Sequence, residues 1–197
     1  MAIHPVDRGG RAIPDASWPA GKEAPGRLEH LRRFLNTANL ESGADHLAES
    51  RGAAVWLGEN GWGLHVLDHA DVARLALVRE QLRDLLVTRT DGSQALMWET
   101  LVDDLELRVV AGAAGLRLGG SGRGTDGIIS ELVAIAVESE LRGEWSRLTA
   151  CGNPSCRWVV YDRTKGRSNV WCSMSACGQR HKQRNYRLRQ ARSATPR

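Results

Sequence analysis

The sequence predicts an α+β protein: a mostly α-helical N-terminal body with a small β-hairpin sheet, followed by a treble-clef-like module built on four cysteines. Three observations lead to this fold class. Apolar residues recur at helical spacing through most of residues 27–142, one short stretch alternates with the period of a β-strand, and all four cysteines lie within residues 151–177. With 197 residues, 42% of them hydrophobic, the chain can form one packed domain and a small appended module.

The first 25 residues predict a flexible leader. They hold four of the six prolines, with three glycines among them, and this composition disfavours regular structure. The stretch lacks the apolar core of a signal peptide, and the chain has no apolar run of about eighteen residues, so we expect no membrane span. A cytoplasmic location follows, where paired cysteines serve more often as metal ligands or catalytic groups than as disulfides.

The helices of the body are predicted from the spacing of apolar residues. Four of them are expected over residues 27–38, around 53–57, over 70–88 and over 93–103. The third has the clearest apolar stripe, and Asp68 or Asp71 is expected to cap its start. A last body helix is predicted over residues 126–142, with Asp126 as its N-cap.

A β-hairpin is predicted between the fourth and the last of these helices. Its apolar residues alternate on either side of the small linker AGAAG, at Leu105, Leu107, Val109, Leu116 and Leu118. The alternation predicts one buried face. A glycine-rich link, GGSGRGTDG, then leads to the last helix.

Two motifs in the body match known ligand-binding sequence patterns, but the structural elements that each kind of site requires are not predicted around them. GRGTDG at residues 122–127 matches the dinucleotide fingerprint, but no second parallel strand is available for a βαβ unit. His65 and His69 are four residues apart, but a helix that starts near Asp68 leaves His65 outside it, and no third ligand is placed. We expect a flexible link and a solvated helix start.

The charge is divided unequally along the chain. Residues 1–150 carry 16 Lys and Arg against 22 Asp and Glu, a balance of −6, whereas residues 151–197 carry 11 Lys and Arg against one acid, a balance of +10. An acidic body and a basic module that binds polyanions are predicted. The alternatives are a solvated basic tail, or a tail that docks on its own acidic body.

The spacing of the cysteines is C-x4-C-x15-C-x4-C, over Cys151, Cys156, Cys172 and Cys177. Two short-spaced pairs across an insert favour a structural zinc site, in which four thiolates leave no position open for water. Metal binding would supply folding energy to a module too small to bury a core of its own. Less favoured readings are two disulfides, an iron–sulfur cluster, a redox pair, or His181 in place of one thiolate.

The residues around the cysteines predict the local structure of the module. Residues 158–161 suit a strand, Lys165-Gly166 a turn, and residues 169–171 a return strand, so a hairpin is expected between the two cysteine pairs. A helix is predicted over residues 175–191. Gly152 and Gly178 each follow a cysteine, where we expect the backbone to curl around the metal.

The helix after the last cysteine is strongly basic. Arg180, Arg184 and Arg187 share one face, and Lys182 and Arg189 share the opposite one. Such a helix suits a groove lined by phosphates, where arginines form paired hydrogen bonds. These five residues are the predicted nucleic-acid contacts.

These motifs also carry a family resemblance. CGN at 151–153, WCSM at 171–174 and C-G-x-R-x-K at 177–182, followed by spaced arginines, resemble the bacterial CGNR zinc-finger family. More loosely, RRFLNT at 32–37 and Trp56-Leu57 resemble the ABATE domain that precedes this finger, described as a stress-induced transcription regulator. The resemblance implies one structural Zn²⁺ on the four cysteines and a DNA-binding role in regulation. The chain departs from the family pattern at Gln179, Asn169 and Val170.

The predicted domain organisation follows from these observations. It comprises a leader (1–25), an α-rich ABATE-like domain (26–148), a CGNR-type zinc finger with a basic C-terminal helix (149–191) and a tail (192–197).

Three function classes compete on this sequence. The favoured one is a DNA-binding transcriptional regulator whose body forms a homodimer or binds a small-molecule effector. The second is a zinc module that binds RNA or an acidic protein. The third, an enzyme in the body, is least favoured because no catalytic motif is found, and we therefore expect a protein that is not an enzyme.

Overall fold

The computed structural model describes residues 21–63, 66–87, 94–103, 105–113 and 115–193. The first 20 residues of the predicted leader lie outside this part of the chain. The described residues form an α+β fold, as predicted, with three two-stranded antiparallel sheets. In chain order the elements are α1 (Leu28–Leu35), β1 (Ala38–Asn39), β2 (Ala44–Asp45), α2 (Ser50–Glu59), α3 (His69–Val87), α4 (Gln94–Val102), β3 (Leu107–Gly112), β4 (Gly115–Gly120), α5 (Gly124–Leu141), η1 (Trp145–Arg147), β5 (Leu148–Ala150), β6 (Val159–Tyr161), η2 (Met174–Gly178) and α6 (Gln179–Ser193).

The five body helices confirm the helical spacing, and the ends of two of them show what limits each helix. Asp68 and Asp71 form a reciprocal cap at the start of α3: each backbone N–H donates to the other's carboxylate, at 2.8 and 3.0 Å. The N-cap predicted for α5 is wrong, because this helix begins at Gly124. Asp126 lies in its first turn instead, where its carboxylate faces the positive end of the helix dipole and pairs with Arg74.

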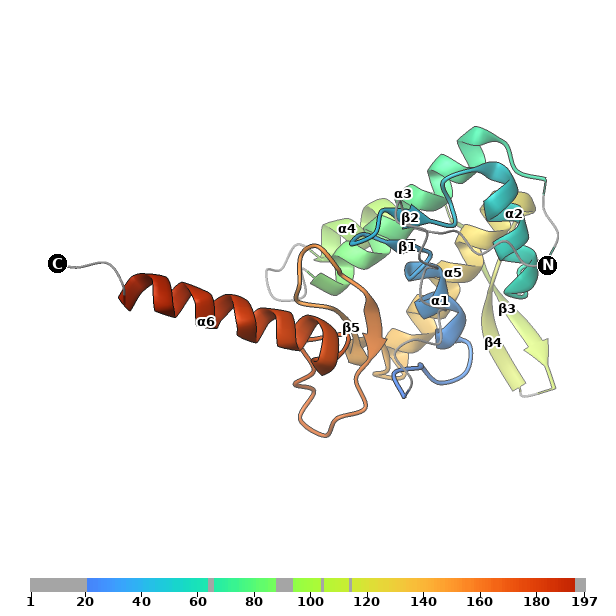
Figure 1. Ribbon diagram of the computed structural model, residues 1–197. Coiled ribbons are helices and arrows are strands. Elements are labelled where there is room, and N and C mark those ends of the chain that lie inside the picture. Colours follow the sequence, from blue (N-terminus) through green and yellow to red (C-terminus); the bar gives the residue numbers. More distant parts are fainter. Residues whose placement is uncertain (1–20, 64–65, 88–93, 104, 114, 194–197) are drawn as a thin grey trace.

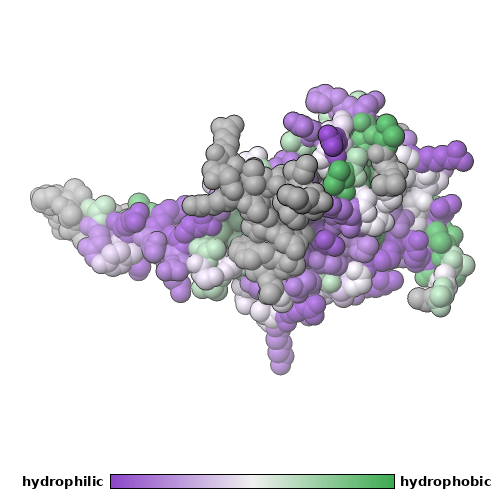
Figure 2. Space-filling model, turned by 45° about the vertical axis from the view of Figure 1, so that its right-hand side comes forward, coloured by the Kyte–Doolittle hydropathy of each residue, from purple (hydrophilic) through white to green (hydrophobic). Residues whose placement is uncertain are grey.

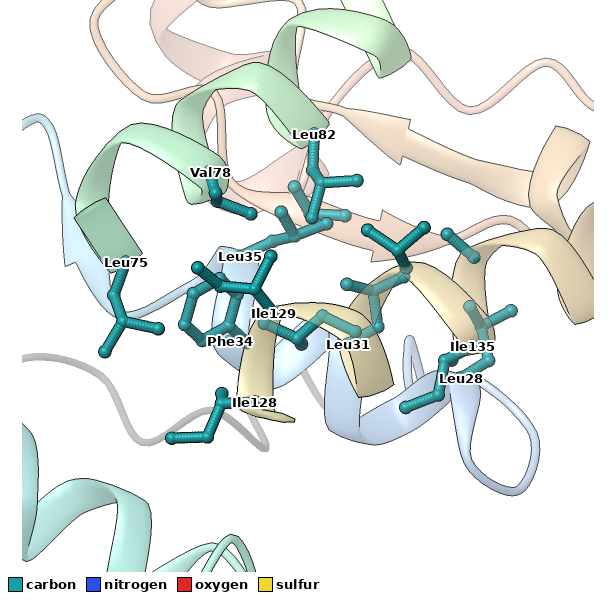
Figure 3. Packing of buried hydrophobic residues seen from close by; sticks show 14 of the residues in the cluster. Leu28, Leu31, Phe34, Leu35, Leu75, Val78, Leu82, Ile128, Ile129 and Ile135 are labelled. Carbon is teal, nitrogen blue, oxygen red and sulfur yellow. The ribbon is translucent and has the colours of Figure 1, made fainter. Parts of the chain in front are cut away.

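The core lies where α1, α3 and α5 meet (Figure 3). Each helix turns one apolar face inward, so that Leu31, Leu75 and Leu132 are completely buried. Burying one such leucine is worth about 1.5–3 kcal/mol relative to leaving it exposed, and this stabilisation holds the three helices together. None of the helices in the described part of the chain is long and apolar enough to cross a membrane.

The β3–β4 hairpin forms as predicted, but the prediction of one buried apolar face is wrong. Val109 and Leu116 are 67% and 75% exposed. The hairpin is held instead by carboxylates of α5: Gly120 N–H donates to Glu131, and Leu118 N–H to Glu138, both at 2.6 Å. A side chain at Gly120 would clash with the backbone of α5, so glycine lets the strand approach the helix closely.

The described part of the structure does not place either of the two ligand-site motifs of the body among the elements that such a site requires. Residues 122–127 comprise the end of the turn after β4 and the first turn of α5, and Gly122 adopts a positive φ of 99° before the helix begins. Every strand pair among the described residues is antiparallel, so the chain they form lacks the βαβ unit that a dinucleotide needs. His69 is the first residue of α3 and is exposed, and His65 lies outside the described residues.

A hairpin is predicted between the two cysteine pairs, but the prediction names the wrong partner for its first strand. β6 pairs with β5, which precedes Cys151, and residues 169–171 are not a strand. The turn at Lys165-Gly166 is present, and Asp162 closes the loop around it by accepting N–H groups of Thr164 and Asn169 at 2.8 and 2.9 Å. Burial of Asp162 opposes its ionisation, but these hydrogen bonds outweigh burial and lower its pKa.

The last helix, α6, projects away from the rest of the molecule. Figure 1 shows α6 extending from the globular part, with the two sheets β1–β2 and β5–β6 near its base. The predicted helix over residues 175–191 is present as a π-helical turn, η2, followed by α6.

Candidate metal centre and basic helix

The four cysteines come from four different parts of the C-terminal module. Cys151 follows β5, Cys156 closes the turn after it, Cys172 ends the long loop, and Cys177 lies in η2. All four are buried, and their Sγ atoms lie within 4.8 Å of one another. Thiols separated by up to 26 positions in the chain are therefore gathered at one point.

The donor set fits one Zn²⁺ ion. Tetrahedral zinc with Zn–S bonds of about 2.3 Å requires Sγ atoms about 3.8 Å apart, and the Sγ atoms of Cys156 and Cys172 are separated by 3.8 Å. Among the described residues, the cluster contains no histidine or carboxylate. The ring of His181 instead lies against that of Trp171, with ring centroids 4.7 Å apart and planes tilted by 37°. Such a closed shell favours a structural ion over a catalytic one.

Hydrogen bonds among three of the thiols shift their pKa values in opposite directions. Hydrogen bonds from Cys156 and Cys172 lower the pKa of the Cys151 thiol, so that its thiolate is favoured. The contact with Cys151 raises the pKa of both Cys156 and Cys172. A metal ion would remove this competition, because it stabilises all of the thiolates at once.

Two residues that sequence reasoning did not connect to the metal donate to Cys177. Asn153 Nδ2 lies 3.6 Å and Arg180 Nη2 3.3 Å from its Sγ atom. Four thiolates around Zn²⁺ carry a net charge of about −2, and N–H donors offset part of that charge. Their place in the C-G-N and C-G-x-R motifs was the available signal, but the contacts depend on the folded geometry.

The two glycines after cysteines serve close packing rather than an unusual backbone angle. A side chain at Gly152 would press on Val170, and one at Gly178 would press on Met174. The left-handed residue of the first cysteine turn is Arg157, with φ 49°. Neither Gly152 nor Gly178 has a positive φ, so the close packing around them, rather than a left-handed backbone, accounts for glycine at both positions.

The module is joined to the body through β6. The carboxamide of Asn36, at the end of α1, bonds both the N–H and the C=O of Val159 at 2.8 Å. Tyr161 N–H donates to Lys22 C=O at 2.9 Å. Asn36 belongs to the RRFLNT motif, so one residue of that motif connects α1 to the module.

The predicted nucleic-acid contacts lie along α6. Lys182, Arg184, Arg187 and Arg189 are exposed, as are Tyr186 and Leu188 between them. Figure 2 shows hydrophilic side chains covering most of the projecting helix. The structure thus presents these four cations on one accessible element.

Arg180 differs from the other four predicted contacts. It sits at the base of α6, where its guanidinium pairs with the carboxylate of Glu41 in the β1–β2 turn and reaches the Sγ atom of Cys177. Arg180 therefore links the metal cluster, the basic helix and the acidic body.

Comparison with known proteins supports the assignment of the C-terminal module as a zinc finger. Residues 147–190 match the family described as CGNR zinc finger. A search of curated proteins finds no match for the chain. The C-terminal module is therefore a CGNR-type zinc finger whose four cysteines are positioned to hold one structural zinc ion.

Proposed function

We propose that this protein is a zinc-dependent DNA-binding transcriptional regulator, in which the four-cysteine zinc site holds α6 for contact with the phosphates of a duplex. The observation that supports this most directly is the projecting basic helix. Four cationic side chains of α6 are exposed on it, and residues 151–197 carry a balance of +10. Bound zinc with four thiolates lowers this to about +8, so the module stays basic.

The zinc ion has a structural role in this proposal. It joins the turn after β5 to η2, and η2 continues directly into α6. The orientation of α6 relative to the body therefore depends on the metal cluster. Arginine on such a helix suits phosphate oxygens, because its planar fork makes two parallel hydrogen bonds.

The body has a regulatory rather than a catalytic role in the same proposal. The sequence contains no catalytic motif of the kinds that need a defined spacing, and the zinc site has no open position. Homodimerisation through the body, or binding of a small-molecule effector there, would supply the regulation.

The test is the salt dependence of binding to duplex DNA, measured by fluorescence anisotropy. Affinity should fall steeply with salt, because neutralising phosphates releases counterions. The double variant Arg184→Ala/Arg187→Ala should weaken binding about tenfold or more at low salt. It should also reduce the slope of log K against log salt by about two, about 0.9 for each lost phosphate contact.

A matched control removes the same charge from the body. Arg51→Ala/Arg142→Ala, at two exposed body arginines, should leave the slope close to that of the unchanged protein. Absence of duplex binding at low salt, with RNA or an acidic protein bound instead, would show that the module serves the second function class.

A further inference from the structure

A small hollow at the base of α6 combines several hydrogen-bond donors. Its volume is about 90 Å³, several times the roughly 10–15 Å³ that a cavity needs to hold one water molecule. The residues that line it are Asn153, Trp171, Cys177, Arg180, His181 and Arg184. Two guanidinium groups, an imidazole and a carboxamide thus meet beside the zinc cluster.

His181 is held in one orientation in this hollow. Its ring lies against Trp171 at a centroid distance of 4.7 Å, and Asn185 Nδ2 lies 2.8 Å from its Nε2 atom. In the orientation that the structure gives its carboxamide, Asn185 donates to Nε2, and a neutral ring then carries its proton on Nδ1. The Nδ1–H group then faces Arg184.

The contact between His181 and Arg184 brings two donors together. Arg184 Nη2 lies 3.4 Å from His181 Nδ1, and a guanidinium group has no acceptor. The ion pairs among the described residues do not include Arg184. An acceptor oxygen placed between the two N–H groups would satisfy both.

We infer that this hollow binds one phosphate group of a nucleic-acid backbone, an inference that rests on the proposed function. A phosphodiester offers acceptor oxygens and no donor, and a tetrahedral group can face Arg180, His181 and Arg184 from one centre. The bound phosphate holds the nucleic-acid backbone beside the zinc cluster. The cations further along α6 then meet successive phosphates or the groove.

The test follows the imidazole nitrogens of His181 by NMR in the full-length, zinc-loaded chain. Inorganic phosphate is added at constant pH and ionic strength, and a DNA duplex is added in a second titration at low salt. Both should shift Nδ1 of His181 in a saturable way. Arg184→Gln should abolish the response to inorganic phosphate, whereas the matched variant Arg51→Gln, at an exposed arginine of the body, should keep it. A zinc content of one per chain shows that each variant is folded.

The outcomes separate this inference from the proposed function. If the duplex binds and His181 responds to neither titrant, DNA binding stands and the phosphate site is wrong. The same conclusion follows if Arg184→Gln and Arg51→Gln respond alike. If inorganic phosphate saturates His181 but no duplex binds at low salt, the proposed function fails, and a site for a free phosphate compound replaces the backbone contact.

Discussion

At the scale of single residues, Cys177 connects the metal cluster to the surface. Its Sγ atom accepts from Asn153 and Arg180, and Arg180 in turn pairs with Glu41. The four cysteines could be predicted from spacing alone, because two short-spaced pairs form a recognisable zinc pattern. Their hydrogen-bond partners could not, because these contacts require η2 and the turn after Cys151 to be folded against each other.

The protonation of the thiols predicts how zinc binding depends on pH. Cys156 and Cys172 have raised pKa values in the metal-free protein, so both keep their protons at neutral pH and must release them to bind zinc. The apparent affinity should therefore rise with pH, by about tenfold per pH unit for each proton released. Competition with a chelator between pH 6 and 8, corrected for the chelator's own protonation, measures this slope.

Two variants complete that experiment. Cys172→Ser should abolish tight zinc binding, while Ser155→Ala, at an exposed neighbour of Cys156, should still bind one zinc per chain. An affinity that does not change with pH, or a cluster that binds iron but not zinc, would contradict the assignment of four zinc-bound thiolates.

At the scale of elements, β6 is the strand that joins the finger to the body. It pairs with β5 on one side, and Asn36 at the end of α1 makes two hydrogen bonds to Val159 within it. Arg32 of α1 adds a bond to the same carbonyl at 3.3 Å. Both side chains are almost completely buried, so the contact is shielded from water.

Replacing the Asn36 side chain tests this junction. Asn36→Ala leaves the Val159 N–H buried without its partner, and an unsatisfied buried donor together with the second lost bond should cost about 2–4 kcal/mol. The free energy of unfolding of the zinc-loaded protein in urea measures the loss. Gln183→Ala, at an exposed amide of α6, is the control and should change stability little. A loss of less than about 1 kcal/mol from Asn36→Ala would show that the junction lies elsewhere.

The elements that could be predicted from the sequence are those with a long apolar period. The helix α3 has an apolar stripe that extends from Val72 to Leu86, and its capping residues could be identified too. The strands β5 and β6 have three residues each, too few for a period, and their pairing depends on the body packed beneath them. The exposed face of the β3–β4 hairpin was missed for a related reason: carboxylates of α5, rather than apolar side chains, hold it.

At the scale of the whole molecule, the acidic body and the basic helix meet at Glu41 and Arg180. The charge split along the sequence predicted the two halves, but it did not show that they touch. In the structure, the carboxylate of Glu41 in the body forms an ion pair with Arg180, which also lines the proposed phosphate site. Binding of a nucleic acid there would require the phosphate to compete with Glu41.

Removing the competing carboxylate should strengthen DNA binding. A partly exposed ion pair is worth about 0.2–1 kcal/mol, so Glu41→Gln should raise the affinity for a duplex at low salt by up to about fivefold. Anisotropy titrations of both proteins check this. Glu140→Gln, at an exposed carboxylate of α5, changes the net charge equally and is the control. Equal effects of the two substitutions would mean that only net charge matters.

The core has a consequence for how this finger can be inherited or reused. Leu148 and Val159 of the finger are completely buried in the same cluster as the helices of the body, and Tyr161 is nearly so. A fragment cut at residue 147 would turn these side chains toward water even with its metal in place. The finger is therefore not a module that folds independently of its body. A gene fusion that transplants it would have to bring a matching apolar face and an equivalent of Asn36.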